Sequence, residues 1–276
     1  MDYFYDLKNT VKQALAEDVG AGDLTAELIE ETTKASAKII SKEQAVLCGK
    51  VWAEETISQV DPEIRTEWQF EDGEEVAFGQ ILVKLDGKAR SILTAERTML
   101  NFMQTLSAVA TKTRILAEKI KHTNSQLLDT RKTIPGLRLA QKYAVKIGGG
   151  QNHRIGLFDA FLIKENHIKA AGGIANAIRK AKKVNNSARI EIEVETIDQL
   201  REALEFEPDW ILLDNFSISD MIRAVEIAKQ KVKLEASGGI SGSDNLLEIA
   251  KTGVDFISMG DLTKNIRAID MSLLLS

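Results

Sequence analysis

The chain has 276 residues, of which 44% are hydrophobic and 28% charged, and its formal net charge at pH 7 is −5. These values are typical of a globular protein with one large domain or two ordinary ones. They argue against nucleic acid as the main partner, because the chain is acidic and only 5% aromatic. The sequence also argues against a membrane span, since no apolar run approaches the roughly 20 residues required.

The N-terminus and the cysteine content predict a cytoplasmic protein. Residues 1–15 contain acidic side chains where a secretory signal would be basic, and no apolar segment follows. The single cysteine, Cys48, has no partner for an internal disulfide, as expected in a reducing compartment. Its apolar neighbours predict a buried side chain rather than a reactive thiol.

The first hundred residues predict an α+β domain. Residues 7–16 have the apolar spacing of a helix, and residues 34–46 have the composition of an extended strand. Short strands separated by glycine-containing turns are expected within residues 68–85. Residues 94–121 then predict a long amphipathic helix that links this domain to the next.

From about residue 127 onward, apolar strands alternate with amphipathic helices such as 197–204 and 220–229. The predicted strands are 126–128, 160–163, 190–194, 210–213, 233–236 and 255–259. Continuous apolar strands joined by helices indicate a parallel sheet that is covered on both faces.

Two architectures fit such repeated units, an α/β barrel and an open, doubly wound sheet. The glycine fingerprint that follows the first strand of a dinucleotide-binding sheet is missing, because Gly148–Gly150 follows a helical stretch instead. Polar residues end the later strands at Glu193, Asp214, Ser237 and Gly260. A barrel brings all such strand ends to one mouth, so we favour the barrel.

Residues 129–168 form a local positive region, with seven Lys or Arg against three acidic residues in a chain that is acidic overall. Five cationic or ionisable side chains follow apolar strands or lie beside the triple glycine. They are Arg131, Lys132, His153, Arg154 and Lys164. This arrangement predicts a pocket for a small polyanion.

The remaining cations of this region are Arg138, Lys142 and Lys146, which lie at helical spacing. We expect them on a solvated helix face or at a subunit contact, outside the pocket.

The later strand ends add oxygen ligands and backbone donors. Glu193 and Asp214 suit Mg²⁺ bound with a diphosphate, since Mg²⁺ takes one or two carboxylates together with substrate phosphates. The run Ser237–Gly239 and Gly260 follow the last two strands, where barrels commonly bind phosphate. The combined set predicts a site for an acidic substrate, a metal and a phosphorylated sugar.

Several spaced motifs now indicate a family. They are Glu17–Thr25 (EDVGAGDLT), Glu96–Thr98 with Asn101-Phe102, Asp129–Thr133 with Pro135-Gly136, Gly148–Arg154 (GGGQNHR), Leu162–His167 (LIKENH), Leu213–Asn215, Ser237–Gly239 and Thr252–Asp255. In these motifs the chain resembles the quinolinate phosphoribosyltransferases over essentially its full length.

The resemblance implies a fold and an assembly. It implies an N-terminal α/β sandwich domain, comprising residues 1–106 with 266–276, and an incomplete, seven-stranded α/β barrel over residues 107–265. This is the type II phosphoribosyltransferase fold, assembled as a homodimer or a higher homo-oligomer.

The resemblance also implies roles for the site residues. The two carboxylates of quinolinate would meet Thr130, Arg131, His153, Arg154 and Lys164, with Arg97 contributed across the interface by the partner subunit. The catalytic set would be Lys132, Glu193 and Asp214, which also bind 5-phosphoribosyl 1-diphosphate, and the two acids would hold Mg²⁺ directly or through substrate and water. The 5-phosphate would lie against Ser237, Gly238, Gly239, Met259, Gly260 and Asp261.

One segment departs from the family pattern. Gly260–Asn265 is Gly-Asp-Leu-Thr-Lys-Asn, where the family commonly has Gly-Ala-Leu-Thr-His-Ser. Lys264 could replace the histidine as a phosphate contact, because both side chains can carry positive charge. Asp261 beside a phosphate site fits only if its carboxylate points away from the phosphate.

The implied reaction is transfer of the phosphoribosyl group to quinolinate with decarboxylation, a step of NAD biosynthesis. Three alternatives remain open from the residues. The chain could use another pyridine or pyrimidine acceptor, could be a non-catalytic metabolite sensor, or could be a Schiff-base lyase in which Lys164 is the nucleophile.

Overall fold

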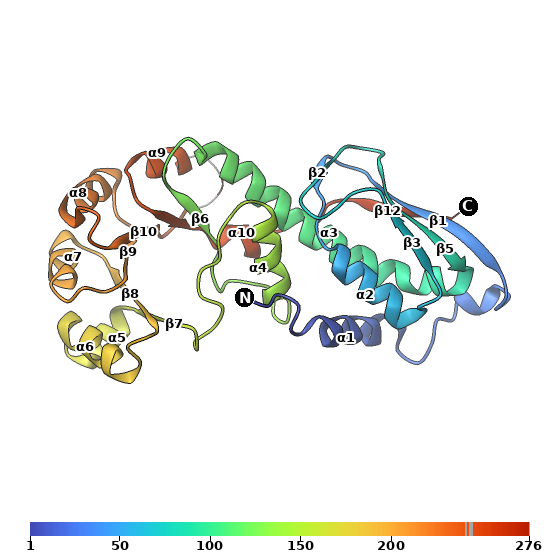
Figure 1. The fold of residues 1–276 in the computed structure, drawn as a ribbon, viewed down its shortest axis with the longest axis horizontal. Helices are drawn as coiled ribbons and strands as arrows, with labels where there is room; N and C mark the ends of the chain where they lie inside the picture. Colours follow the sequence, from blue (N-terminus) through green and yellow to red (C-terminus); the bar gives the residue numbers. More distant parts are fainter. Residues whose placement is uncertain (241, 243–244, 276) are drawn as a thin grey trace. The chain divides into compact units, whose positions relative to one another are not determined.

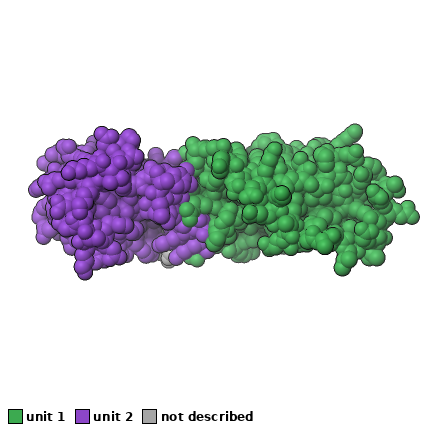
Figure 2. Space-filling view, turned by 90° about the horizontal axis from the view of Figure 1, so that it is seen from below, with its two compact units in different colours: residues 1–114, 134–149, 265–276 green, residues 115–133, 150–264 purple. Residues whose placement is uncertain are grey.

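The computed structural model describes residues 1–240, 242 and 245–275 (Figure 1). The chain divides into two compact units (Figure 2). Unit 1 comprises Met1–Arg114, Ile134–Gly149 and Asn265–Ser276, and unit 2 comprises Ile115–Thr133 and Gly150–Lys264. Compact units need not coincide with domains that fold alone, so the domain boundaries given above stay a prediction.

Unit 1 contains antiparallel sheets and helices. One sheet has the strand order β12-β1-β5-β3, and a second consists of β2 and β4. The elements are α1 (Leu7–Val19), a 3-10 helix (Ala26–Leu28), β1 (Lys34–Ser41), β2 (Ala45–Val46), α2 (Lys50–Val60), β3 (Arg65–Trp68), β4 (Glu75–Val76), β5 (Ile81–Lys88), α4 (Arg138–Ile147) and β12 (Met271–Leu275). The long helix α3 (Ala89–Ile120) begins in unit 1 and ends in unit 2.

The core of unit 1 follows from two periodicities. Along β1, Ala37, Ile39 and Ser41 are buried while the residues between them are more exposed, which is the period of two that a strand requires. Met99 and Met103 lie one turn apart on α3, and they belong to the same hydrophobic core as Ile39.

Helix α4 overturns one expectation. Lys142 was expected on a solvated face, but its side chain is fully buried, whereas Lys146 is exposed. The reason is that α4 is enclosed from more than one side within unit 1. Tyr143 packs its ring against Trp52 at 5.4 Å, and Gly148, just after the helix, lies against Ala110 and Thr113 of α3.

Unit 2 is built on a parallel sheet with the strand order β6-β11-β10-β9-β8-β7. The strands are β6 (Gln126–Leu128), β7 (Ala160–Ile163), β8 (Arg189–Val194), β9 (Trp210–Asp214), β10 (Lys233–Ser237) and β11 (Phe256–Ser258). The helices are α5 (Glu165–Ala171), α6 (Ile174–Val184), α7 (Ile197–Leu204), α8 (Ile218–Ala228), α9 (Leu246–Lys251) and α10 (Asp261–Lys264). Figure 1 shows α6, α7 and α8 ranged along the outside of these strands.

The predicted α/β class with an incomplete barrel is confirmed, with one correction to the strand count. Within the described residues the parallel sheet has six strands rather than seven. The seventh position is reduced to Gln151, which forms an isolated parallel bridge with Leu128 of β6. A single paired residue is too short to count as a strand, although it still extends the sheet by one step.

The strand register places the candidate residues at one edge of the sheet. Ser237 at the end of β10 lies opposite Asp214 at the end of β9, and Ser258 at the end of β11 lies opposite Leu128 of β6. Because the strands are parallel, their carboxyl ends and the loops that follow share this edge. Among the described residues, no helix combines the length and the apolar character needed to cross a bilayer.

Candidate active site

Asp129 fixes the loop that carries two of the candidate residues. It follows β6 directly and is fully buried. Its carboxylate accepts hydrogen bonds from the backbone N–H of His153 at 2.9 Å and from the side-chain amide of Asn152 at 2.8 Å. The segment 151–154 is thereby fixed beside the carboxyl end of β6, which brings His153 and Arg154 to the functional edge.

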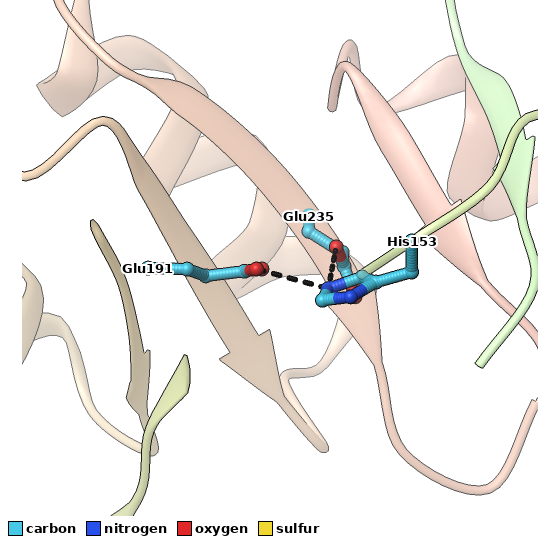
Figure 3. A group of neighbouring side chains, drawn as sticks. All are labelled: His153, Glu191 and Glu235. Carbon is cyan, nitrogen blue, oxygen red and sulfur yellow. Dashed lines mark ion pairs between the residues drawn. The ribbon is translucent and has the colours of Figure 1, made fainter. Parts of the chain in front are cut away.

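His153 lies between two buried glutamates (Figure 3). Its Nε2 is 2.9 Å from Oε2 of Glu191, on β8, and 3.3 Å from Oε2 of Glu235, on β10. The three side chains are 6%, 0% and 1% exposed. Such close packing of one imidazole and two carboxylates in a dry environment is costly unless protons are shared among them.

The pKa shifts within this cluster follow from its geometry. Burial alone would lower the pKa of His153, but hydrogen bonding to Glu191 and Glu235 outweighs it and raises that pKa. Burial and the nearby Glu235 carboxylate raise the pKa of Glu191. The imidazole and the two carboxylates therefore influence one another's pKa directly.

Glu191 and Glu235 were missed in the sequence, although the sequence contained a signal. Each lies in the middle of a strand between apolar residues that are buried, such as Ile190 and Ile192 around Glu191. A carboxylate in the middle of a sheet that is covered on both faces is unusual, and it marks a side chain directed into the interior.

Arg131 and Arg154 form the cationic part of the site. The Nε–H of Arg131 is buried and donates no hydrogen bond to a partner within the described residues. Burial and the positive charge of Arg131 both lower the pKa of Arg154. One N–H of Arg154 donates to the carbonyl of Ala160 at 3.3 Å. Two guanidinium groups that disfavour each other's charge are suited to bind an anion, which would relieve both.

Lys164 and Glu193 were predicted for different ligands, but here they bind each other. Lys164 follows β7, and its ammonium forms an ion pair with the Glu193 carboxylate on β8. The Lys164 side chain is 48% exposed. Nδ1 of His167 accepts a hydrogen bond from the backbone N–H of Lys164 at 3.0 Å, which gives this histidine a structural role.

Asp214 ends β9, the strand that pairs with β8, and its carboxylate accepts a hydrogen bond from the Asn215 amide at 3.0 Å. Together Glu193 and Asp214 provide two hard carboxylates from neighbouring strands. This donor set fits Mg²⁺, which completes its shell with water and substrate phosphates.

Thr130, Lys132 and Gly260 lie side by side. A side chain on Gly260 would place its Cβ 2.8 Å from Cδ of Lys132 and 3.3 Å from the hydroxyl of Thr130. The hydroxyl of Thr263 also donates to the Lys132 carbonyl at 2.7 Å. The loops after β6 and β11 are thus packed together, and a larger residue at position 260 would displace the Lys132 side chain.

Met259 and Asp261 contribute differently from the predicted backbone contacts. The backbone N–H of Met259 donates to the Leu128 carbonyl at 2.9 Å, so the sheet already uses it, and the side chain is buried. The buried carboxylate of Asp261 accepts the Gly242 N–H at 3.2 Å, which explains how an acid is accommodated here. Lys264 is exposed.

The Ser237–Gly239 turn has the backbone geometry expected of a close approach. Gly238 has a φ of +97°, and a Cβ there would lie 2.3 Å from Oδ1 of Asn215. Only glycine fits this position. The other predicted residue, Arg97, is exposed on the part of α3 that belongs to unit 1.

Comparisons with known proteins agree along the whole chain. Residues 23–107 match the N-terminal domain of quinolinate phosphoribosyl transferase, and residues 109–274 match its C-terminal domain. The chloroplastic nicotinate-nucleotide pyrophosphorylase (carboxylating) of Arabidopsis thaliana is 39% identical, covering 98% of this chain and 82% of that protein. A probable enzyme of the same name from Bacillus subtilis is 37% identical, covering 97% and 92%.

Solved structures give the same result. The structure of the nicotinate-nucleotide pyrophosphorylase from Francisella tularensis superposes with a TM-score of 0.95 at 51% identity, covering 98% of this chain and 96% of that one. Matches to both domain families, together with this similarity in sequence and fold, lead to one conclusion: the chain belongs to the quinolinate phosphoribosyltransferase family.

Proposed function

We propose that this protein transfers the phosphoribosyl group of 5-phosphoribosyl 1-diphosphate to quinolinate, with loss of CO₂, giving nicotinate mononucleotide and diphosphate. Family membership supports this activity. The observation that carries it is the pair Arg131 and Arg154. The Nε of Arg131 is buried without a partner among the described residues, and its guanidinium is close enough to Arg154 to lower the pKa of Arg154. A dicarboxylate supplies the charge that this pair needs.

Quinolinate binding would use the cationic edge of unit 2. Arg131 and Arg154 would bind its carboxylates, and Lys164 would join them after leaving Glu193. His153 would not bind a carboxylate through Nε2, because Glu191 and Glu235 already face that nitrogen.

Glu193 and Asp214 would hold Mg²⁺ together with the diphosphate and the ribose hydroxyls. Bound Mg²⁺ would neutralise the charge of the leaving diphosphate. Separation of Glu193 from Lys164 would couple the binding of the two substrates. Quinolinate would bind Lys164, and phosphoribosyl diphosphate with Mg²⁺ would bind Glu193. Lys132, beside Gly260, would lie near the sugar and stabilise the departing diphosphate.

The chemistry demands mainly positioning and charge stabilisation from the protein. As the C1–O bond to diphosphate breaks, the pyridine nitrogen donates its electron pair to ribose C1. The ring nitrogen then carries positive charge, so the electron pair left at C2 when CO₂ departs is stabilised. Uptake of one proton at C2 completes the product.

The Schiff-base alternative lacks support at Lys164. A nucleophilic lysine needs a desolvated, uncharged amine. Here the side chain is nearly half exposed and its ammonium is paired with Glu193.

The decisive experiment measures CO₂ release from carboxyl-labelled quinolinate. Release is expected only when phosphoribosyl diphosphate and Mg²⁺ are both present, and nicotinate serves as the control acceptor. Turnover of nicotinate in preference to quinolinate would assign a different acceptor and contradict the proposal.

A homo-oligomer in which Arg97 completes the partner's pocket is part of the proposal, because Arg97 is exposed on unit 1 while the other cations belong to unit 2. Mixing inactive Arg97→Ala protein with inactive Lys164→Ala protein should restore part of the activity, since some pockets would then contain both intact residues. No recovery after verified subunit exchange would rule out a shared pocket.

A further inference from the structure

The proposed reaction leaves unexplained why two carboxylates, Glu191 and Glu235, are buried around one imidazole. Both oxygens of Glu191 are buried, and neither accepts a hydrogen bond of ordinary geometry within the described residues. Replacing a buried ionic group by an apolar residue is often neutral or stabilising, so burial of this kind is poorly explained by stability alone.

The tautomer of His153 follows from its other nitrogen. The backbone N–H of Arg154 donates to Nδ1 of His153 at 2.8 Å. A nitrogen that accepts a hydrogen bond has its lone pair directed at the donor and carries no proton. The imidazole proton is therefore on Nε2, the nitrogen that faces Glu191 and Glu235.

The same geometry argues against a metal in this cluster. One ligand atom from each of His153, Glu191 and Glu235 lies within 4.8 Å of the others, as a metal site would require. A metal-binding histidine, however, donates the proton of its second nitrogen to an acceptor. Here the second nitrogen accepts a hydrogen bond instead, so the proton of the neutral ring is on Nε2 and the lone pair of Nε2 is not available to a cation.

We propose that Glu191 and Glu235 are positioning residues, which hold His153 as its Nε2–H tautomer so that Nδ1 fixes the backbone of Arg154 at the anion pocket. This inference rests on the proposed function for its effect on quinolinate. His153 acts as the link between the two glutamates and Arg154, rather than as a direct contact of the substrate.

Four strands contribute to this arrangement. Asp129, after β6, holds the backbone N–H of His153, while Glu191 of β8 and Glu235 of β10 hold its ring. Trp210 of β9 meets the ring edge-on, with centroids 6.2 Å apart. Side chains on strands are held more rigidly than a loop alone could be, so the loop at 152–154 acquires the precision of the sheet.

The kinetic test compares Ala and Gln substitutions at both glutamates. For Glu191→Ala and Glu235→Ala we expect KM for quinolinate to rise by about tenfold or more, because Arg154 loses its fixed position. KM for phosphoribosyl diphosphate should change by less than about twofold. Glu191→Gln and Glu235→Gln retain an oxygen facing Nε2, so quinolinate binding should stay within about threefold of the unsubstituted protein. Glu226→Ala, on the exposed face of α8, is the control.

Two kinetic outcomes would overturn the proposal. One is an equal rise of both KM values, which would indicate general loss of structure rather than positioning of Arg154. The other is a Gln variant as impaired as the matching Ala variant, which would mean that the reaction uses the charge of the carboxylate.

A second measurement needs no substrate and no glutamate variant. Long-range ¹H–¹⁵N correlation spectra of the ¹⁵N-labelled protein report the tautomer of each histidine, and the chain has only three. His122→Gln and His167→Gln, both at exposed positions, assign the His153 signals by elimination. In spectra recorded above the raised pKa of His153, we expect the neutral imidazole to carry its proton on Nε2.

A proton on Nδ1 of the neutral ring would overturn the positioning role of the two glutamates. Absence of CO₂ release from quinolinate by the unsubstituted protein would instead refute the proposed function and leave the tautomer result to stand alone. The two failures are therefore distinguishable.

Discussion

Each unit contains a cluster of ionisable side chains, and the two clusters are satisfied to different degrees. In unit 1 the Asp72 carboxylate accepts the Lys50 backbone N–H at 3.1 Å and the Tyr143 hydroxyl at 2.9 Å. In unit 2 both oxygens of Glu191 are buried without a hydrogen bond of ordinary geometry among the described residues. A satisfied cluster stabilises a fold, whereas an under-satisfied one costs stability and calls for another purpose.

The two clusters also differ in what surrounds them. Tyr143 packs against Phe4 and Trp52, with ring centroids 5.4 Å from each, so its cluster ties the N-terminal segment, α2 and α4 together within unit 1. The His153 cluster is instead continuous with Arg154 and the cationic edge of unit 2. Burial raises the pKa of Asp72 and of Tyr143, which keeps the tyrosine a hydrogen-bond donor at neutral pH.

The largest effect should come from Arg131→Ala. Removing this guanidinium should lower kcat/KM for quinolinate by more than about tenfold, because a substrate carboxylate loses its partner, while the unfolding midpoint stays unchanged. Steady-state kinetics and thermal unfolding measure the two quantities, and Lys169→Ala, at an exposed position of α5, is the control. Unchanged quinolinate kinetics would show that Arg131 is not part of the site. The functional role assigned to this region of unit 2 would then be contradicted.

Gly148→Ala should affect stability in unit 1. A Cβ at this position would lie 2.5 Å from the Ala110 carbonyl and from Cβ of Thr113, so α4 must shift away from α3. Overpacking of this kind costs about 1–3 kcal/mol of unfolding free energy, measured by chemical denaturation. In the control, Gly156→Ala, the new Cβ meets only the exposed ring of Phe158, which can rotate away. Equal losses in both variants would contradict the close packing of α4.

Tyr143→Phe tests the satisfied cluster directly. Loss of the hydroxyl leaves the Asp72 carboxylate with one donor fewer, so we expect a loss of about 1–2 kcal/mol in unfolding free energy with activity per folded molecule unchanged. Denaturation combined with the CO₂ assay gives both values, and Tyr5→Phe, at an exposed tyrosine, is the control. A fall in activity without a fall in stability would erase the distinction between the two clusters.

The smallest effect concerns Asp61, another satisfied carboxylate of unit 1. Hydrogen bonds from the Ser91 hydroxyl and the Glu63 backbone N–H lower its pKa. A lowered pKa contributes stability above the pKa of the unfolded chain, and this contribution disappears as the pH falls through the folded value. Asp61→Asn should therefore cost about 1 kcal/mol at pH 7, and the difference should narrow as the pH is lowered below about 4. A gap that widens in acid would reverse the assigned sign.

The regular parts of the fold could be predicted because periodicity alone determines them. The strands at 126–128 and 160–163 and the helix at 197–204 lie where their apolar spacing places them. Lys142 could not be predicted, since its burial depends on how α3 and the N-terminal segment enclose α4, and helical spacing contains no information on either.

The candidate site was predictable where residues lie at or just after the carboxyl end of a strand, and unpredictable where they lie in the middle of one. Arg131 and Glu193 were found because polar residues at strand ends converge in a barrel. Glu191 and Glu235 required knowledge of which strands are neighbours of His153, which depends on sheet order. The pairing of Lys164 with Glu193 depends on the β7–β8 register for the same reason.

The position of β12 has a consequence for biosynthesis. Ser41 of β1 pairs with Met271 of β12, although all of unit 2 lies between them in the sequence. While the chain grows on the ribosome, β12 is not yet available to pair with β1. The edge of β1 therefore exposes a row of unpaired N–H and carbonyl groups. The strands of the parallel sheet in unit 2 are synthesised in succession. All of them are therefore available before β12, the last strand of the unit 1 sheet, has been synthesised. A nascent chain that ends before residue 271 would therefore be prone to strand-mediated association through β1.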